Sequence, residues 1–461
     1  MSTERIVSGT ATLEEIRDAL RQAPLVAVRQ ELPDQSILDA CDRCNHVWRE
    51  RLYDPIVTVL HFIAQALQRD ISFAGTWQEF LTPVAAKFLG AFDFNFDRSA
   101  LTHARGRLPV GVLETLARDA CKRASQLPSR PWKRLRLVAL DSSTVSMPRD
   151  GQLCNHFGLH KVGSTISRYP LATFASLLDI SYSLLLDYRI GPYDPGEIST
   201  ATPLLASLKK GDILLADRLF SNAPFIIRVA GTGADFLMRK NALLRVDRLP
   251  VIERLGRDDF ITELPLNEKT RRKYPELPAM VRVRFFKSYW KAPDGGKVYE
   301  WFVTSLLDSR RFKKTTLAGL FHCRWQMETS YLEFKQTFHA AVMRSKTVDN
   351  VYKELTAHVL AYQLVRLLMA HAAQRSGKKP TEISTLNASR WIMAFSRAMA
   401  PMPACKLPSM YLTLLDAIAS NEIDVRPGRS APRALCRDWK RYPRLRISRQ
   451  EWRTIQLARV S

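Results

Sequence analysis

The sequence lacks several features that mark common classes of protein. It has no apolar run of about 18 residues or more and no signal-like start, so we expect a soluble, cytoplasmic protein without a membrane span. Its seven cysteines are scattered and odd in number, which predicts free thiols in a reducing compartment and no disulfide framework. A Gly-rich phosphate loop of the nucleotide-binding type is also missing.

A zinc site is not favoured either. Cys41 and Cys44 form one CxxC pair with His46 nearby. No second pair of ligands follows at the spacing of a zinc finger. Two free thiols are therefore the simpler interpretation of this motif.

Basic residues greatly outnumber acidic ones. The chain has 69 Lys and Arg against 45 Asp and Glu, a formal charge of +24. Such an excess predicts a polyanionic partner, and nucleic acid comes first because its nonspecific affinity arises mainly from Lys and Arg replacing counterions along the phosphates. An anionic membrane is the alternative, which the lack of apolar segments disfavours.

At 461 residues the chain is long enough for two to four domains. Residues 1–130 predict an all-helical N-terminal domain, with helices near Tyr53–Gln68, Thr76–Phe92 and Val110–Ser125. Residues Ser99–Pro109 carry two arginines, so this domain either contacts DNA or has an ordinary charged surface.

Residues 131–240 contain several apolar runs that are typical of the strands of a sheet. The apolar runs Arg136–Leu140 and Asp212–Ala216 each end at an aspartate, Asp141 and Asp217. Two strands within 169–190, a helix at Pro224–Ala230 and a strand at Asp235–Lys240 complete the order. This order predicts an α/β fold, a ribonuclease H-like mixed sheet. Each aspartate taken alone also fits a turn or cap residue.

The rest of the chain, residues 241–461, divides into three parts. Residues 241–305 predict a β-rich insertion, with strands at Val281–Lys287 and Val298–Thr304 and a hairpin turn at Pro293–Gly296. Residues 306–375 should complete the core with a helix that carries Glu328, and 376–461 predict a helical, basic C-terminal region. The Arg-rich end is either a DNA-contacting arm or a solvated tail.

The stretch from Phe321 to Lys335 predicts one helix, because it has neither Pro nor Gly. Its spacing places Phe321, Arg324, Glu328 and Lys335 along one face. A carboxylate between two cations suits a divalent ion beside a phosphate backbone. A solvated face with ion pairs to Glu328 or Glu333 is the alternative.

Two aspartates after strands and a glutamate on a later helix are what two-metal phosphoryl transfer requires. Carboxylate oxygens are ligands that Mg²⁺ or Mn²⁺ prefers, and two ions can activate the attacking oxygen and stabilise the leaving one. No nucleophile is needed from the protein, because water or a DNA hydroxyl serves.

These residues resemble a known family, the DDE transposases of bacterial insertion sequences, and within it insertion-sequence family four. The family signature is Y-x2-R-x3-E-x6-K, and Arg324, Glu328 and Lys335 match it in register, with Phe321 in place of the tyrosine. The first-aspartate motif, its downstream Phe-Gly and the D-R-x-Y/F motif are matched by Asp141–Thr144, Phe157–Gly158 and Asp217–Phe220 respectively.

The resemblance implies the chemistry. Asp141, Asp217 and Glu328 would bind two Mg²⁺ ions, with Mn²⁺ as a substitute, and the enzyme would cut transposon ends and join their 3′-hydroxyls to target DNA. Its partners would be double-stranded terminal repeats, target DNA and a second copy of the chain in a synaptic dimer. The expected location is the bacterial cytoplasm, at the nucleoid.

The resemblance also implies residues that contact DNA. Arg324 and Lys335 would contact phosphates near the scissile bond, and Trp301 matches a tryptophan that stacks on a flipped base in a related transposase, although a core position in its strand is the alternative. The remaining residues assigned to DNA are Phe321, Arg239 and Arg218.

Two other functions stay open on the sequence. A Mg²⁺-dependent nuclease with the same core would cut DNA without joining it. A noncatalytic DNA-binding protein derived from a transposase would bind only, but the intact Asp141, Asp217 and Glu328 count against it.

Overall fold

The computed structural model describes residues 12–22, 25–68, 73–87, 98–128, 131–162, 165–291 and 296–423. The chain divides into two compact units, of which the larger comprises Met1–Trp290 and Lys297–Ile423. The smaller unit comprises Lys291–Gly296 and Asp424–Ser461. Of the first segment only the two end residues are described, and the second segment, which includes the Arg-rich tail, lies outside the described residues. The larger unit holds the site.

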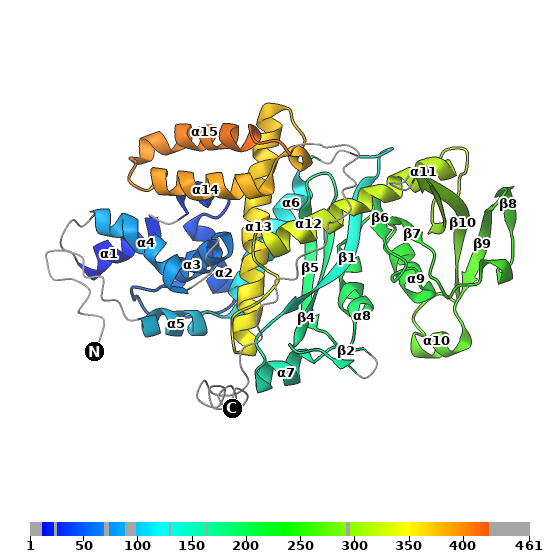
Figure 1. Ribbon diagram of the computed structural model, residues 1–461, viewed down its shortest axis with the longest axis horizontal. Helices are drawn as coiled ribbons and strands as arrows, with labels where there is room; N and C mark the ends of the chain where they lie inside the picture. The colour runs from blue at the N-terminus through cyan, green and yellow to red at the C-terminus, as the bar shows by residue number, and fades with distance from the viewer. Residues whose placement is uncertain are drawn as a thin grey trace, which may run out of the picture. The chain divides into compact units, whose positions relative to one another are not determined.

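A mixed sheet of nine strands forms the centre of this unit (Figure 1). In spatial order the strands are β5 (Leu184–Pro192), β4 (Leu171–Asp179), β1 (Arg136–Ser146), β6 (Asp212–Ala216), β7 (Asp235–Arg239), β11 (Lys297–Thr304), β10 (Met280–Lys291), β9 (Asp259–Pro265) and β8 (Glu253–Gly256). A separate two-stranded ribbon pairs β2 (Lys161–Val162) with β3 (Thr165–Ile166).

The first five strands have the ribonuclease H-like arrangement. Strand β4 runs antiparallel to both β5 and β1, whereas β1, β6 and β7 are parallel to one another. The three strands β1, β4 and β5 are therefore consecutive neighbours, and β6 and β7 are added on the other side of β1. The predicted α/β fold class is confirmed.

The apolar runs of β1 and β6 are buried on both sides, as expected for central strands of a covered sheet. On β1, Leu137 and Ala139 join one hydrophobic cluster, and Val138 and Leu140 join the cluster on the opposite face. The strands also begin together, because Arg136 and Asp212 form a buried bidentate ion pair with distances of 2.8 and 2.9 Å.

The expected β-rich insertion does not form a separate sheet. Strand β11 pairs antiparallel with β7, so β11, β10, β9 and β8 extend the central sheet. An unpaired edge strand leaves backbone donors and acceptors exposed, and this pairing satisfies those of β7. The predicted strands at Val281–Lys287 and Val298–Thr304 lie within β10 and β11, whereas most of the predicted turn, 292–295, lies outside the described residues.

Helices surround the sheet on both faces (Figure 1). The first half of the chain forms α1 (Leu13–Gln22), α2 (Asp34–Arg43), α3 (Pro55–Leu67), α4 (Phe73–Lys87), α5 (Arg98–Arg107), α6 (Val110–Gln126), α7 (Gly151–Phe157), α8 (Glu197–Ala201) and α9 (Ala223–Gly231). The second half forms α10 (Glu268–Lys273), α11 (Lys314–Phe321), α12 (Trp325–Gln336), α13 (Val348–Ser376), α14 (Thr385–Met399) and α15 (Leu407–Ala419).

The long helix α13 joins the helical regions to the sheet. It contacts α3 and α6 of the N-terminal region, β5 of the sheet, and α14 and α15. Most of its residues are buried. Within the described part of the chain, no helix is both long and apolar enough to span a bilayer.

Candidate active site

The two aspartates come together because β1 and β6 are parallel and in register. Leu140 pairs with Ala216, so Asp141 and Asp217 follow at the same level of the sheet. One detail of the prediction is wrong: Asp141 does not end its strand, because β1 continues to Ser146. The reason is β4, which pairs with β1 as far as Ser146 after the pairing with β6 has ended.

Asp141 lies where its negative charge is disfavoured. Burial, with smaller contributions from the neighbouring carboxylates of Asp217 and Glu197, raises the pKa of its carboxyl to about 6, against the lowering effects of the Ser142 amide and Arg324. The Ser142 amide donates to Asp141 Oδ1 at 2.8 Å. A buried carboxyl with a raised pKa beside other carboxylates, in a strongly basic chain, is typical of a functional site.

Arg324 links two of the three predicted catalytic carboxylates. Its Nη2 lies 2.6 Å from Glu328 Oε1, and its Nη1 lies 3.5 Å from Asp141 Oδ2. The arginine is 8% exposed. The structure therefore contains the Arg324–Glu328 ion pair that was the alternative interpretation of this face. The arginine of this pair is buried and also contacts Asp141, so the pair is part of the group of carboxylates and not of a solvated surface.

The predicted single helix over Phe321–Lys335 is wrong in its first part. Helix α11 ends at Phe321, a 3₁₀ turn covers His322–Arg324, and α12 begins at Trp325. The tighter turn changes the angular spacing between Phe321 and Arg324. Phe321 is consequently 7% exposed, packs edge-to-face on Phe302 and lies under the Arg324 guanidinium. This burial does not favour a direct contact with DNA.

Asp217 lies in a second ionic group at the end of β7. Arg239 Nη1 is 3.6 Å from Asp217 Oδ1, and its Nη2 is 2.8 Å from Glu300 Oε2. The Arg218 amide donates to Asp217 Oδ1 at 2.7 Å, while the Arg218 side chain is exposed. Arg239 thus lies beside a predicted catalytic aspartate, and Arg218 is on the adjoining surface.

Lys335 and Trp301 are both half-buried. Burial lowers the pKa of Lys335, and among the described residues no carboxylate pairs with it, so the alternative of an ion pair with Glu328 or Glu333 is not seen. Trp301 packs against Phe260 and lines a groove of about 450 Å³ together with the cations Lys240, Arg245 and Arg254.

The carboxylates have the right chemistry for a divalent cation, since all three supply hard oxygen donors. Among the described residues, however, no three metal-binding side chains stand close enough to hold an ion together. Arg324 accounts for this, because its guanidinium occupies the space between Asp141 and Glu328. The donor set fits a metal site if that guanidinium moves aside.

Two residues at the site were missed by the sequence reasoning. The Tyr331 hydroxyl donates to the Asp141 carbonyl at 2.6 Å, and Ser142 Oγ donates to Glu197 Oε2 at 2.6 Å. Tyr331 follows Glu328 by three positions, so helical spacing carried a signal for it. No local pattern in the sequence indicates Glu197, because its position beside β1 depends on how the chain folds back over the sheet after β5.

The chain is similar to known transposases in sequence. Residues 132–364 match the transposase DDE domain family. The chain is 25% identical over 354 residues to the transposase InsG for insertion sequence element IS4 of Escherichia coli K12, a match that covers 75% of this chain and 78% of that protein. It is 26% identical over 141 residues to the putative transposase InsZ of the same organism, covering 30% and 47% of the two chains.

A solved structure was also found, that of a piggyBac transposase synaptic complex with hairpin DNA. It has a TM-score of 0.44 and 9% sequence identity, and the alignment covers 88% of this chain and 86% of that one.

Proposed function

This chain belongs to the DDE transposases of the bacterial IS4 family, and from that premise we propose that Asp141, Asp217 and Glu328 are the carboxylates at which this DNA transposase cuts and joins strands. The observation that carries the assignment is the parallel register of β1 and β6, which sets Asp141 beside Asp217. Arg324 adds Glu328 from helix α12 to the same group.

These three side chains would hold two Mg²⁺ ions, with Mn²⁺ as a substitute. The family acts with divalent metal, and two bound ions would activate the attacking oxygen and stabilise the leaving one. Asp141 and Asp217 contribute oxygens from the sheet. Glu328 joins them when Arg324 turns from the carboxylates toward the DNA backbone, a change that exchanges one anionic partner of the guanidinium for another.

The reaction consists of two in-line displacements. In the first, water attacks the phosphorus at the transposon end, the bond to the 3′ oxygen breaks, and a 3′-hydroxyl is released. In the second, this hydroxyl attacks a phosphodiester of target DNA and displaces its 3′ oxygen. The number of phosphodiester bonds is conserved in the second step, so no external energy source is required.

Other side chains would hold the DNA. Lys335 is without a partner carboxylate among the described residues and follows Glu328 by about two turns of α12, which suits a phosphate contact. Arg239 and Arg218 lie beside Asp217. Trp301 borders a groove that also holds Lys240, Arg254 and the ion-paired Arg245 and Asp247, where an unpaired base could stack. Phe321 supports Arg324 from below.

A nuclease remains the second candidate, because cutting and joining use the same carboxylates. The functional unit we propose is a homodimer that holds two terminal repeats. Location at the bacterial nucleoid is a further prediction, which fluorescence microscopy of a tagged chain would check.

The test is Mg²⁺-dependent cleavage and joining of a labelled terminal-repeat duplex by the wild type and by Glu328→Ala. We expect the wild type to nick the end and join it to target DNA, and the variant to bind without doing either. Glu268→Gln, which alters an exposed carboxylate on α10, is the control and should react normally. Cleavage by Glu328→Ala at the wild-type rate would refute the metal-site assignment, and cutting without joining by the wild type would favour a nuclease.

A further inference from the structure

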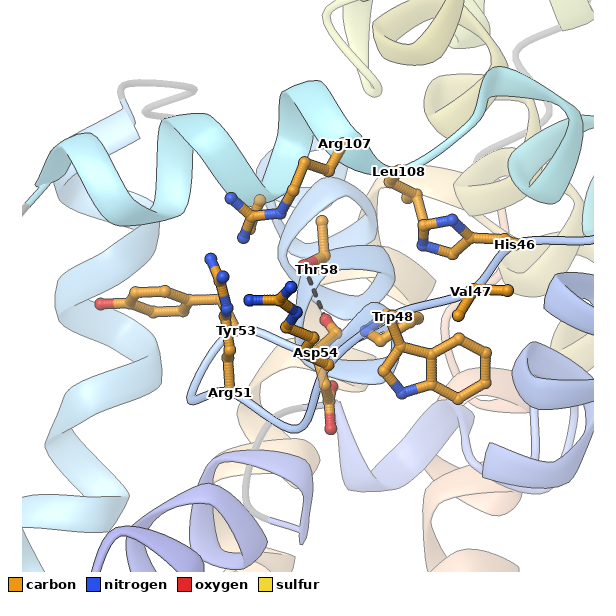
Figure 2. Close-up of a pocket in the computed structure, with 12 residues that line it drawn as sticks. His46, Val47, Trp48, Arg51, Tyr53, Asp54, Thr58, Arg107 and Leu108 are labelled. Carbon is orange, nitrogen blue, oxygen red and sulfur yellow. Dashed lines mark hydrogen bonds between the residues drawn. The ribbon is translucent and has the colours of Figure 1, made fainter.

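A pocket of about 210 Å³ lies in the N-terminal helical region, away from the sheet strands that carry the aspartates. Its walls come from two parts of the chain: the loop that connects α2 to α3, together with the first turn of α3, and the end of α5. Figure 2 shows Arg51 and Arg107 extending their guanidinium groups toward the same space, one from each segment. The family match begins at residue 132, so it assigns nothing to this pocket.

The arginines of the pocket are not neutralised by nearby acids. Arg49, Arg51 and Arg107 line the pocket, and no described carboxylate forms an ion pair with them. The two acids of the same loop are already engaged. Glu50 pairs with Arg17 at 3.3 Å, and the buried Asp54 pairs with Arg21, both partners coming from α1.

The uncompensated charge also acts on the titratable groups of the pocket itself. Burial lowers the pKa of Arg107, and repulsion by Arg51 lowers it further. Behind the pocket, the buried Lys353 of α13 donates to the carbonyls of Arg105 and Gly106, each at 3.0 Å. Burial, Arg107 and Lys353 together lower the pKa of His46. Two guanidiniums that repel each other favour a bound anion.

Planar rings line another part of the same pocket. His46 and Trp48 lie with ring centroids 5.9 Å apart and an angle of 31° between their planes. Figure 2 shows both rings on the other side of the pocket from the two guanidiniums. Between them in sequence, Val47 is 92% exposed at the tip of the loop. Phosphate-binding cations beside an indole are the combination that binds a nucleotide.

The size of the pocket argues for part of a larger molecule. A pocket that encloses a whole small ligand has a volume of roughly 300–1,000 Å³. At about 210 Å³ and open to solvent through exposed arginines, this pocket has room for one phosphate and part of a ring. A strand of DNA meets that condition, because its neighbouring nucleotides stay outside.

We propose that this pocket binds one nucleotide unit of DNA outside the active site, with the phosphate between Arg51 and Arg107 and the sugar or base against Trp48. The proposal rests on the function of the chain as a DNA transposase and not on the assignment of the three carboxylates. A free nucleotide presents the same chemistry, so the experiment separates these two sources.

The experiment measures binding of a fluorescent terminal-repeat duplex by anisotropy, without Mg²⁺, so that no strand is cut. The full chain is compared with Arg51→Gln/Arg107→Gln, and the control is Arg43→Gln/Lys122→Gln, which removes the same charge from cations that pair with Asp119. We expect the pocket variant to bind about tenfold more weakly. The slope of log affinity against log salt should fall by about 1 for each DNA phosphate that the variant no longer neutralises. The control should change neither quantity.

Trp48→Ala provides a second variant that leaves the charge unchanged. It should weaken binding severalfold without altering the salt slope, because a ring that packs on a base or sugar displaces no counterion. Melting curves of all variants verify that they are folded. Equal decreases in affinity in the pocket variant and the control would show a diffuse charge effect and overturn the proposal.

Competition separates the two sources of phosphate. Millimolar dAMP or inorganic phosphate should displace the duplex only weakly if the pocket takes one unit of a DNA strand. Tight binding of dAMP that disappears in the Arg51→Gln/Arg107→Gln variant, with duplex affinity unchanged, would overturn the DNA assignment and show a free-nucleotide site. Because Glu328→Ala is tested for cleavage and this pocket for binding, either proposal can fail while the other holds.

Discussion

The hydroxyl of Tyr331 donates a hydrogen bond of 2.6 Å to the backbone carbonyl of Asp141. This bond joins helix α12 to strand β1, and so joins the element that carries Glu328 to the strand that carries the first aspartate. Tyr331 is buried and also lies 3.1 Å from Ser176 Oγ on β4. The relative position of two proposed metal ligands therefore depends on a residue that binds neither metal nor DNA.

Tyr331→Phe should show whether the Tyr331 hydroxyl positions Asp141 for cleavage or only stabilises the fold. Removing the hydroxyl deletes its hydrogen bonds with the Asp141 carbonyl and Ser176 Oγ and costs about 1–2 kcal/mol of unfolding free energy, and looser placement of Asp141 should lower the cleavage rate about tenfold. Tyr362→Phe is the matched control, because the Tyr362 hydroxyl is also buried and donates to the Ser183 carbonyl at 2.6 Å. Urea unfolding and cleavage assays should show stability losses of similar size in the two variants and a rate loss in Tyr331→Phe alone; equal rates would contradict the positioning role.

Arg324→Gln should strengthen metal binding while weakening catalysis. The guanidinium competes with a cation for Asp141 and Glu328, so its removal should raise the affinity for Mn²⁺ about fivefold, equal to ~1 kcal/mol. Electron paramagnetic resonance of free Mn²⁺ measures this without DNA. Cleavage should fall because glutamine carries no charge to hold the DNA phosphate. Weaker Mn²⁺ binding in the variant would mean instead that Arg324 holds Glu328 in its ligating position.

Breaking the buried pair Arg284–Asp259 on one side should destabilise the sheet extension more than replacing both residues with apolar ones. Arg284 is fully buried, its guanidinium meets both Asp259 oxygens at 2.7 Å, and its Nη1 donates to the Phe312 carbonyl at 2.7 Å. Asp259→Ala leaves that charge unpaired and should cost about 3–5 kcal/mol in urea unfolding. The double variant Asp259→Leu/Arg284→Met should regain most of the loss. A double variant as unstable as the single one would show that the ion pair itself is required.

His358 should make stability depend on pH. It is 2% exposed in α13, and burial lowers its pKa to about 4 from an ordinary value near 6.5. Between these values the unfolded chain binds a proton that the folded chain does not, so the free energy of unfolding falls as the pH decreases. The loss attributable to this group is about 2 kcal/mol at pH 5. Urea unfolding at pH 7 and pH 5 should show a smaller difference in His358→Leu, and an unchanged difference would exclude His358 as the cause.

Much of the fold could be predicted because its signals are local. The apolar runs of β1, β6 and β7 and the helical periodicity of α3, α6 and α13 predict those elements, since burial on a strand or helix leaves a regular pattern in the sequence. The ribbon β2–β3 and the outer strands β8 and β9 were missed. Strands β2, β3 and β8 are short or carry exposed residues, so their pairing comes from neighbours rather than from their own composition. Strand β9 is longer and mostly buried, so in its case a local signal was present and was overlooked.

The sequence by itself determined the residue types of the site and their order: two aspartates after apolar runs, then the Arg324, Glu328 and Lys335 spacing. It determined these because each motif lies within one element. Only the tertiary structure decided that Asp141 lies inside its strand, that Arg324 bridges Asp141 and Glu328, and that Phe321 is buried. The same holds for the pocket formed by Arg51 and Arg107. Each of these facts joins segments far apart in the chain, and such contacts are decided by packing and charge pairing between elements, which no local pattern contains.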